Sequence, residues 1–183
     1  MIVYIKQATS WARAYWAALR TEGKDGKGKE PSDKWKKSML LCEHSPIRTV
    51  EYDIEVTGIR QWVTVHLVRH WLGFIPFIHS QREDRRELSS PRDELPQGSL
   101  NDMAASANAQ ALINISRKRL CGKASKETRE AWRAVKKEME KVDPVMASVM
   151  VPECVYRGFC PERRCCGFVN TEVYQKMLEE YRG

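Results

Sequence analysis

Arginine side chains recur through the middle of the chain together with serine, histidine and asparagine. In chain order the set is Arg69, His70, Ser80, Arg82, Arg92, Asn108, Asn114 and Arg119. A guanidinium group presents a planar fork of donors that matches phosphate oxygens and carbonyl edges. A single arginine of this kind would be interpreted as a surface ion-pair partner. The ordered series instead indicates a site for a nucleotide, with its phosphate and its flat polar ring.

The elements that must position these residues begin with a short strand at residues 3–5 and a helix at residues 9–19. A Gly- and Lys-rich loop covers residues 21–32, after which Ser32 and Asp33 cap a helix that runs to Leu41. Residues 49–57 alternate between apolar and polar types, which predicts a half-buried strand ended by Gly58. Residues 59–70 then form a helix, and its spacing places His66, Arg69 and His70 on one face.

The second half of the chain is predicted to be mostly helical. Residues 74–80 form an edge strand or extended segment around Pro76, and residues 81–98 form a connecting loop. The Ala-rich residues 100–120 read as one long helix, which places Asn108 and Arg119 on the same face about 16 Å apart. Ser125 caps the next helix, which Pro144 interrupts, and a terminal helix covers residues 171–181. We therefore expect one α+β domain over residues 1–183, with a Cys-rich loop at 154–166.

Composition restricts the class of protein. The 183 residues are 42% hydrophobic and 30% charged, which is typical of a soluble globular domain. The sequence has no apolar run of membrane-spanning length and no secretory signal pattern, so we expect a cytoplasmic protein without membrane contact. The net charge of +7 allows nucleic-acid binding. Because the excess lysines cluster with acids in residues 24–37, that partner is not expected, and a solvated surface explains them.

Four strings of residues, taken together, resemble the flavin-dependent thymidylate synthases. The family's Arg-His-Arg, spacer and Ser-x-Arg correspond to Arg69-His70-Trp71, eight residues and Ser80-Gln81-Arg82. Its His-x-x-Pro segment is similar to His44-Ser45-Pro46, and its Arg-x-x-Leu-Pro to Arg92-Asp93-Glu94-Leu95-Pro96. Its Asn-rich helix followed by Leu-Arg corresponds to Asn108, Asn114 and Lys118-Arg119. The resemblance spans residues 42–132 with the order and most spacings retained.

The resemblance implies a central antiparallel sheet flanked by helices, assembled as a homotetramer with active sites between subunits. It implies conversion of dUMP to dTMP, with bound FAD and with methylenetetrahydrofolate and NADPH as co-substrates. Carried over by position, substrate-binding residues are His66, Ser80, Arg82, Arg92 and Arg119. Arg119 and Ser80 are the catalytic candidates, and Arg119 faces the pyrimidine, where a cation stabilises developing negative charge. Cofactor contacts are Arg69, His70, Trp71, Asn108 and Asn114. The guanidinium groups of 82, 92 and 119 are expected to converge across neighbouring subunits.

The chain departs from the family on the flavin side. Trp71 replaces the third residue of Arg-His-Arg, Gln110 replaces the arginine of Asn-x-Arg, and Arg48-Thr49 stand where many members have Glu-His. The nucleotide side retains Ser80, Arg82, Arg92 and Arg119. Two alternatives therefore stay open: a related enzyme that makes another C5-modified pyrimidine nucleotide, such as a hydroxymethyl product, and a nucleotide-binding paralogue that has lost flavin chemistry.

Simpler structural roles exist for several of these residues. His70 could be a cation at a helix C-terminus, and Asn108 and Asn114 could cap or bridge helices. Zinc is a further alternative for the cysteines, with candidates Cys121, Cys154, Cys160 and Cys165. The sequence contains no Cys-x-x-Cys knuckle, so no metal is predicted and buried reduced thiols explain them.

Overall fold

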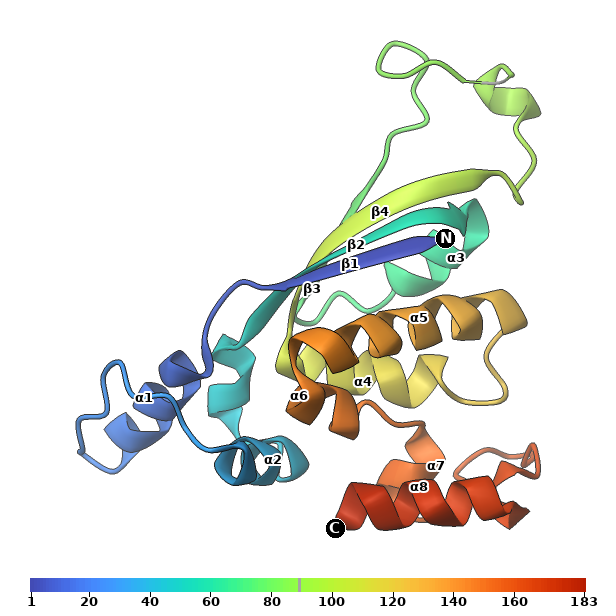
Figure 1. The fold of residues 1–183 in the computed structure, drawn as a ribbon. Coiled ribbons are helices and arrows are strands. Elements are labelled where there is room, and N and C mark those ends of the chain that lie inside the picture. The colour runs from blue at the N-terminus through green and yellow to red at the C-terminus, as the bar shows by residue number, and fades with distance from the viewer. Residues whose placement is uncertain (89) are drawn as a thin grey trace.

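The computed structural model describes residues 1–88 and 90–183. Figure 1 shows the elements, which follow in the order β1 (Ile2–Gln7), α1 (Trp11–Thr21), α2 (Asp33–Leu41), η1 (Ser45–Thr49), β2 (Glu51–Arg60), α3 (Gln61–Leu67), β3 (Phe74–Ile78), η2 (Arg92–Glu94), β4 (Leu100–Asn108), α4 (Ala109–Arg119), α5 (Lys126–Val142), α6 (Pro144–Val149), α7 (Glu153–Arg157), η3 (Phe168–Asn170) and α8 (Glu172–Arg182). Across these two ranges, no helix is both long enough and apolar enough to cross a bilayer.

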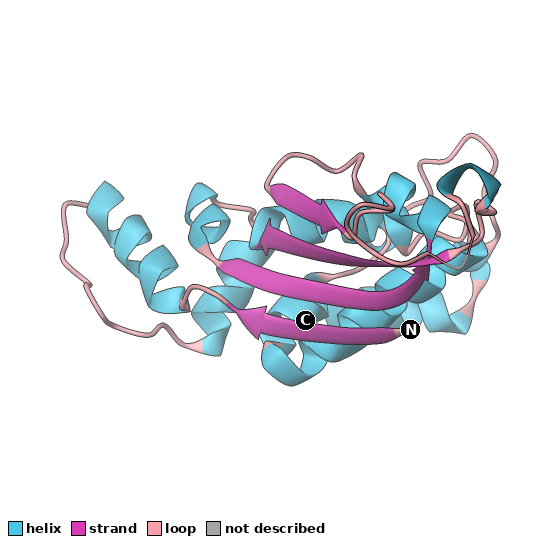
Figure 2. Ribbon diagram, turned by 90° about the horizontal axis from the view of Figure 1, so that it is seen from above, coloured by secondary structure: helices cyan, strands magenta, loops and turns pink. Residues whose placement is uncertain are grey.

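A four-stranded antiparallel sheet organises the molecule. The strand order is β1-β2-β4-β3, so β1 and β3 are the edges (Figure 2). Helices α4 and α5 lie along one face of the sheet (Figure 1). The opposite face carries Tyr4, Ile75 and Phe77 and is open to solvent in the single chain. The expected mixture of helices and antiparallel sheet is confirmed, as is the edge position of the strand around Pro76.

The sequence predicts that the strand over residues 49–57 ends at Gly58, but strand β2 continues past this residue. Tyr52, Ile54 and Val56 alternate with exposed residues as expected, but the strand continues to Arg60. The register against β4 shifts between Val56 and Ile59, and Gly58 has a φ of +73°, so the glycine forms a bulge rather than a stop.

The helix expected at residues 59–70 is shorter than predicted. Helix α3 begins at Gln61 and ends at Leu67, so Arg69 and His70 lie in the turn that follows it. His70 N–H donates to the Leu67 carbonyl oxygen at 3.0 Å and closes this turn. The expected placement of His66, Arg69 and His70 on one helical face is therefore wrong, although all three still lie at the same end of α3.

The single helix expected over residues 100–120 is wrong in its first half. Leu100–Asn108 is the strand β4, in which Asn101, Met103, Ala105 and Ala107 are buried and the intervening residues are not. The period of two outweighs the helical propensity of alanine because small side chains suit a sheet face packed closely on a helix. Helix α4 begins only at Ala109, so Asn108 and Arg119 do not share a helical face and Asn108 is the N-cap.

The helical layer closes the core largely as predicted. Helix α5 buries Thr128, Ala131, Trp132, Val135 and Met139, and Ser125 caps it as expected. Ser32 caps α2 in the same way. Helix α5 ends at Val142, just before Pro144, and Asp143 caps the next helix, α6.

The C-terminal segment differs in one respect from the expected Cys-rich loop. Cys154 is not in a loop but in helix α7, where it is buried. Helix α8 then follows at Glu172–Arg182, capped by Thr171. The connecting loop expected at residues 81–98 is present and includes η2, and its residue Ser89 lies outside the residues that the structure describes.

Candidate functional site

Arg119, the last residue of α4, joins this helix to the end of α3. Its Nε–H donates to His70 Nε2 at 2.9 Å, and one Nη–H donates to the His66 carbonyl oxygen at 2.5 Å. Two of the five guanidinium N–H groups are used in this way, which leaves three for a ligand. The structure therefore holds this half-buried cation in a fixed orientation while most of its donors stay available.

His66 is held between α3 and α5. Its Nδ1 lies 2.8 Å from the Thr128 hydroxyl, and its ring packs edge-on against Trp62 at 5.4 Å between centroids. Burial, together with the positive charges of Arg119 and Arg69, lowers the pKa of His66. The imidazole is therefore neutral near pH 7, and it can position a hydrogen bond without adding charge.

His70 is neutral for the same physical reasons. Burial, followed by repulsion from Arg119 and Lys118, lowers the pKa of His70 from 6.5 to about 4. A neutral ring is also what the geometry requires, since Nε2 accepts a hydrogen bond from Arg119. His70 therefore does not act as a cation at the C-terminus of a helix, which was the simpler alternative for this residue.

The depressed pKa of His70 predicts how stability depends on pH. Between pH 6.5 and about 4 the unfolded chain binds a proton at His70 that the native state does not bind. Stability contributed by this residue is therefore complete above pH 6.5 and is lost as the pH falls toward 4. Urea unfolding of the wild type and of His70→Gln, measured between pH 6.5 and about 4, should show a smaller decrease in the free energy of unfolding for the variant. Equal losses in the two proteins would contradict the assignment.

Four of the five predicted cofactor residues line one cavity. Arg69, His70, Trp71 and Asn114 surround a volume of about 140 Å³ together with the apolar Leu72, Ala111 and Ile115. Trp71 is 73% exposed although it is the largest side-chain type. The turn after α3 and one face of α4 thus present donors, an aromatic plane and an apolar surface side by side.

Asn108 does not line this cavity and has a structural role. Its Oδ1 accepts a hydrogen bond from Ala111 N–H at 2.9 Å and caps α4. Its side chain also packs against Gly73, where a Cβ would lie 2.5 Å from the Asn108 Nδ2. The capping interpretation is confirmed for this residue, and a contact of its side chain with a cofactor stays a prediction.

Ser80, Arg82 and Arg92 lie together in the loop that precedes β4. The Ser80 Oγ accepts a hydrogen bond from Arg82 N–H at 3.2 Å. Arg82 and Arg92 line a common cavity of about 450 Å³, whose other residues include Glu83 and Asp84. Arg82 Nε and Nη donate to Asp84 at 2.9 and 2.7 Å, so in the single chain its fork is engaged by a carboxylate.

The two groups of predicted substrate residues are separate within one chain. Arg119 ends α4 and His66 lies in α3, whereas Arg82 and Arg92 lie in the loop that joins β3 to the N-terminal end of β4 and projects away from the helical layer (Figure 1). Arg119 does not line the cavity shared by Arg82 and Arg92. A single chain therefore does not bring residues 82, 92 and 119 together, and their convergence across subunits stays a prediction.

Sequence reasoning missed the partners of α4. Gln110 Nε2 donates to Glu43 at 2.5 Å, and Arg117 forms an ion pair with the same carboxylate. Burial opposes the charge of Glu43, but the hydrogen bonds from Arg117 and Gln110 hold the pKa of Glu43 below its ordinary value. Gln110 is thus turned toward Glu43 and is not among the residues that line the Arg69–Asn114 cavity. No local signal could have revealed a partner 67 residues away.

The six cysteines are free thiols. Over residues 1–88 and 90–183, no three His, Cys, Asp or Glu side chains are grouped so as to hold a metal ion. Cys154 is buried, and burial raises the pKa of its thiol to about 11. A protonated thiol of this kind acts as a small apolar side chain in the core.

The fold belongs to a class that is known from solved structures. The chain is similar to the flavin-dependent thymidylate synthase ThyX from Helicobacter pylori, solved in complex with FAD and dUMP. That match has a TM-score of 0.56 and 18% identity over 75% of this chain and 93% of that one. It is also similar to the UMP/dUMP methylase PolB from Streptomyces cacaoi, bound with 5-Br dUMP, with a TM-score of 0.61 and 14% identity over 86% and 96%. No family model and no curated protein matches the sequence. The expected fold of helices and an antiparallel sheet is thus confirmed, and the homotetramer stays a prediction.

Proposed function

We propose that this protein is a flavin-dependent enzyme that modifies C5 of dUMP and produces dTMP with methylenetetrahydrofolate and NADPH. One observation carries the proposal. Arg119, an arginine with free donors, is fixed between two neutral histidines beside the cavity that Arg69, Trp71 and Asn114 line. The two similar structures add support, since one was solved with FAD and dUMP and the other with 5-Br dUMP.

The residues around the small cavity fit one edge of a flavin. Arg69 and Asn114 offer N–H donors to ring carbonyl oxygens and nitrogens, and the exposed Trp71 offers a flat surface for offset stacking. The volume of about 140 Å³ lies below the roughly 300–1,000 Å³ of complete small-molecule sites, so one chain supplies one wall. When bound, FAD would accept a hydride from NADPH and supply the reducing power for transfer of the one-carbon unit.

The protein's own residues would stabilise charge and hold the nucleotide. The remaining N–H groups of Arg119 can donate to the pyrimidine oxygen on which negative charge develops when C5 becomes nucleophilic. His70 and the His66 carbonyl orient this guanidinium by accepting its other hydrogen bonds. Preorganised donors of this kind pay no reorganisation cost during the reaction.

Arg82, Arg92 and Ser80 would bind the phosphate. The Arg82 fork that now holds Asp84 matches phosphate oxygens as well as it matches a carboxylate. The open face of the sheet, with Tyr4, Ile75 and Phe77 each more than half exposed, supports assembly into a homotetramer.

The direct test is spectroscopy and turnover of the purified protein. We expect a yellow protein that releases tritium from 5-tritiated dUMP when both methylenetetrahydrofolate and NADPH are supplied, with omission of either as the control. Mass spectrometry of the product should give dTMP, and a hydroxymethyl nucleotide would instead support the related C5-modifying activity. A colourless protein that neither takes up FAD nor releases tritium would refute the proposal, even if it bound dUMP.

A further inference from the structure

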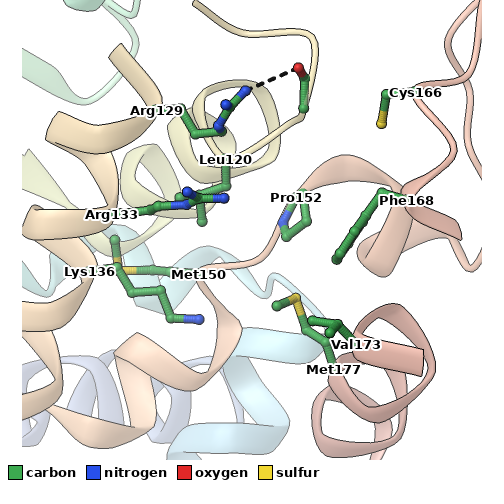
Figure 3. A pocket seen from close by; sticks show the side chains of 11 residues that line it. Leu120, Arg129, Arg133, Lys136, Met150, Pro152, Cys166, Phe168, Val173 and Met177 are labelled. Carbon is green, nitrogen blue, oxygen red and sulfur yellow. Dashed lines mark hydrogen bonds between the residues drawn. The ribbon is translucent and has the colours of Figure 1, made fainter. Parts of the chain in front are cut away.

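A third cavity lies between α5 and the C-terminal segment (Figure 3). Its volume of about 450 Å³ is within the range of small-molecule sites. It shares no lining residue with the cavity around Trp71 and Asn114. The proposed dUMP chemistry therefore makes no use of it.

The floor of this cavity is apolar and built from several elements. Leu120 follows α4, Met150 and Pro152 lie between α6 and α7, and Phe168, Val173 and Met177 belong to η3 and α8. Met150 and Pro152 are buried, and Phe168 is held edge-on against Tyr174 at 5.8 Å between ring centroids. These contacts fix the shape of the floor, so the cavity is preformed for an apolar body.

One wall of the same cavity is cationic. Arg129, Arg133 and Lys136 follow one another along a single face of α5, and no Asp or Glu is among the lining residues. The ion pairs of residues 1–88 and 90–183 do not include any of these three cations. Figure 3 shows the three side chains on the α5 side, opposite Val173 and Met177. The cavity thus combines an apolar floor with three cations that belong to none of these ion pairs.

Two of the cations are also poorly solvated. Arg129 Nη donates to the Gly122 and Ala124 carbonyl oxygens at 3.1 and 3.3 Å, while its buried Nε–H has no partner. Burial lowers the pKa of Lys136, although Glu140 and Glu180 act in the opposite direction. Desolvated cations and unpaired donors carry a free-energy cost that an anionic acceptor would relieve.

We propose that this cavity binds a small organic anion whose carboxylate or phosphate head contacts Arg133 and Lys136 and whose apolar body, one or two rings in size, packs on Met150, Phe168 and Met177. The charge selects the head group and the apolar floor selects the body. Neither feature alone would be selective, because isolated surface cations bind anions weakly and a bare apolar floor does not fix the orientation of a ligand.

Fluorescence titration with 8-anilino-1-naphthalenesulfonate tests the proposal, since this probe carries an anionic head on an apolar body. We expect saturable binding of one probe per chain and competition by 1-naphthyl phosphate and 1-naphthoate, with the stronger competitor identifying the preferred head. The double variant Arg133→Gln/Lys136→Gln should weaken binding by about tenfold or more, as expected for loss of charge-assisted hydrogen bonds. Val173→Trp should abolish binding by filling the cavity.

The matched control is Lys137→Gln, which removes an exposed lysine next to Lys136 that does not line the cavity. It should bind the probe as the wild type does. Thermal unfolding of each variant verifies that it is folded. The proposal is overturned if the double variant and Val173→Trp bind as tightly as Lys137→Gln, or if neither the probe nor the competitors bind saturably.

Discussion

Replacement of Arg119 by glutamine is expected to lower the rate of dUMP turnover by roughly a hundred- to a thousandfold. Glutamine can retain one of the two hydrogen bonds that now join Arg119 to His70 and to the His66 carbonyl. It cannot supply the positive charge that would face the pyrimidine. The loss should therefore fall mainly on the chemical step. Tritium release from 5-tritiated dUMP measures it, and Arg20→Gln on the exposed side of α1 is the control.

Mixing two inactive variants extends this test to the assembly. If Arg82 of one subunit and Arg119 of another complete each site, then a reassembled one-to-one mixture of Arg82→Gln and Arg119→Gln should recover about a quarter of wild-type activity, because that fraction of sites receives both arginines. A site built within one chain would leave the mixture inactive. That outcome would contradict the shared site while leaving the role of Arg119 itself intact.

Local patterns were sufficient to predict much of the fold. The alternation in β2 and the apolar stripe of α5 each bury one face of a regular element, so the sequence shows them directly. The pattern failed at β4, where three alanines suggested a helix although the burial of Asn101, Met103, Ala105 and Ala107 alternates with less buried neighbours. The alanine content of this segment favours a helix, whereas its alternating burial is that of a strand. Packing against the helical layer stabilises the strand.

The candidate site was predictable as a set of residues but not as an arrangement. Motif order identified Arg69, His70, Asn114 and Arg119, and the structure brings these residues to adjoining positions. The bond between Arg119 and His70 spans 49 residues, and spacing along the chain carries no information about such a contact. The cationic cavity along α5 was missed for a similar reason, since its apolar floor comes from the C-terminal segment.

Replacement of Asp143 by alanine is expected to destabilise the protein by about 2–6 kcal/mol, from two buried donors left unsatisfied at about 1–3 kcal/mol each, the largest effect on stability predicted for any side chain considered above. Asp143 is 6% exposed and accepts hydrogen bonds from Trp11 Nε1 at 2.6 Å, Tyr52 hydroxyl at 2.7 Å and Met146 N–H at 2.9 Å. Burial, and then the Asp143 charge, raise the pKa of Tyr52, so this hydroxyl remains a donor. Alanine would leave both aromatic donors buried without an acceptor.

A double-mutant cycle separates the loss of the Tyr52–Asp143 hydrogen bond from the loss of the Asp143 cap on Met146 N–H. Tyr52→Phe removes one of the two donors, so in the Asp143→Ala background it should cost less than it does in the wild type. Urea unfolding followed by tryptophan fluorescence measures all four proteins, and Asp53→Ala on the exposed face of β2 is the matched carboxylate control. Additive effects of the two substitutions would show that the hydroxyl and the carboxylate do not interact. A non-additive result would show that the Tyr52 hydroxyl and the Asp143 carboxylate interact, so that this hydrogen bond joins β2 to the N-terminus of α6.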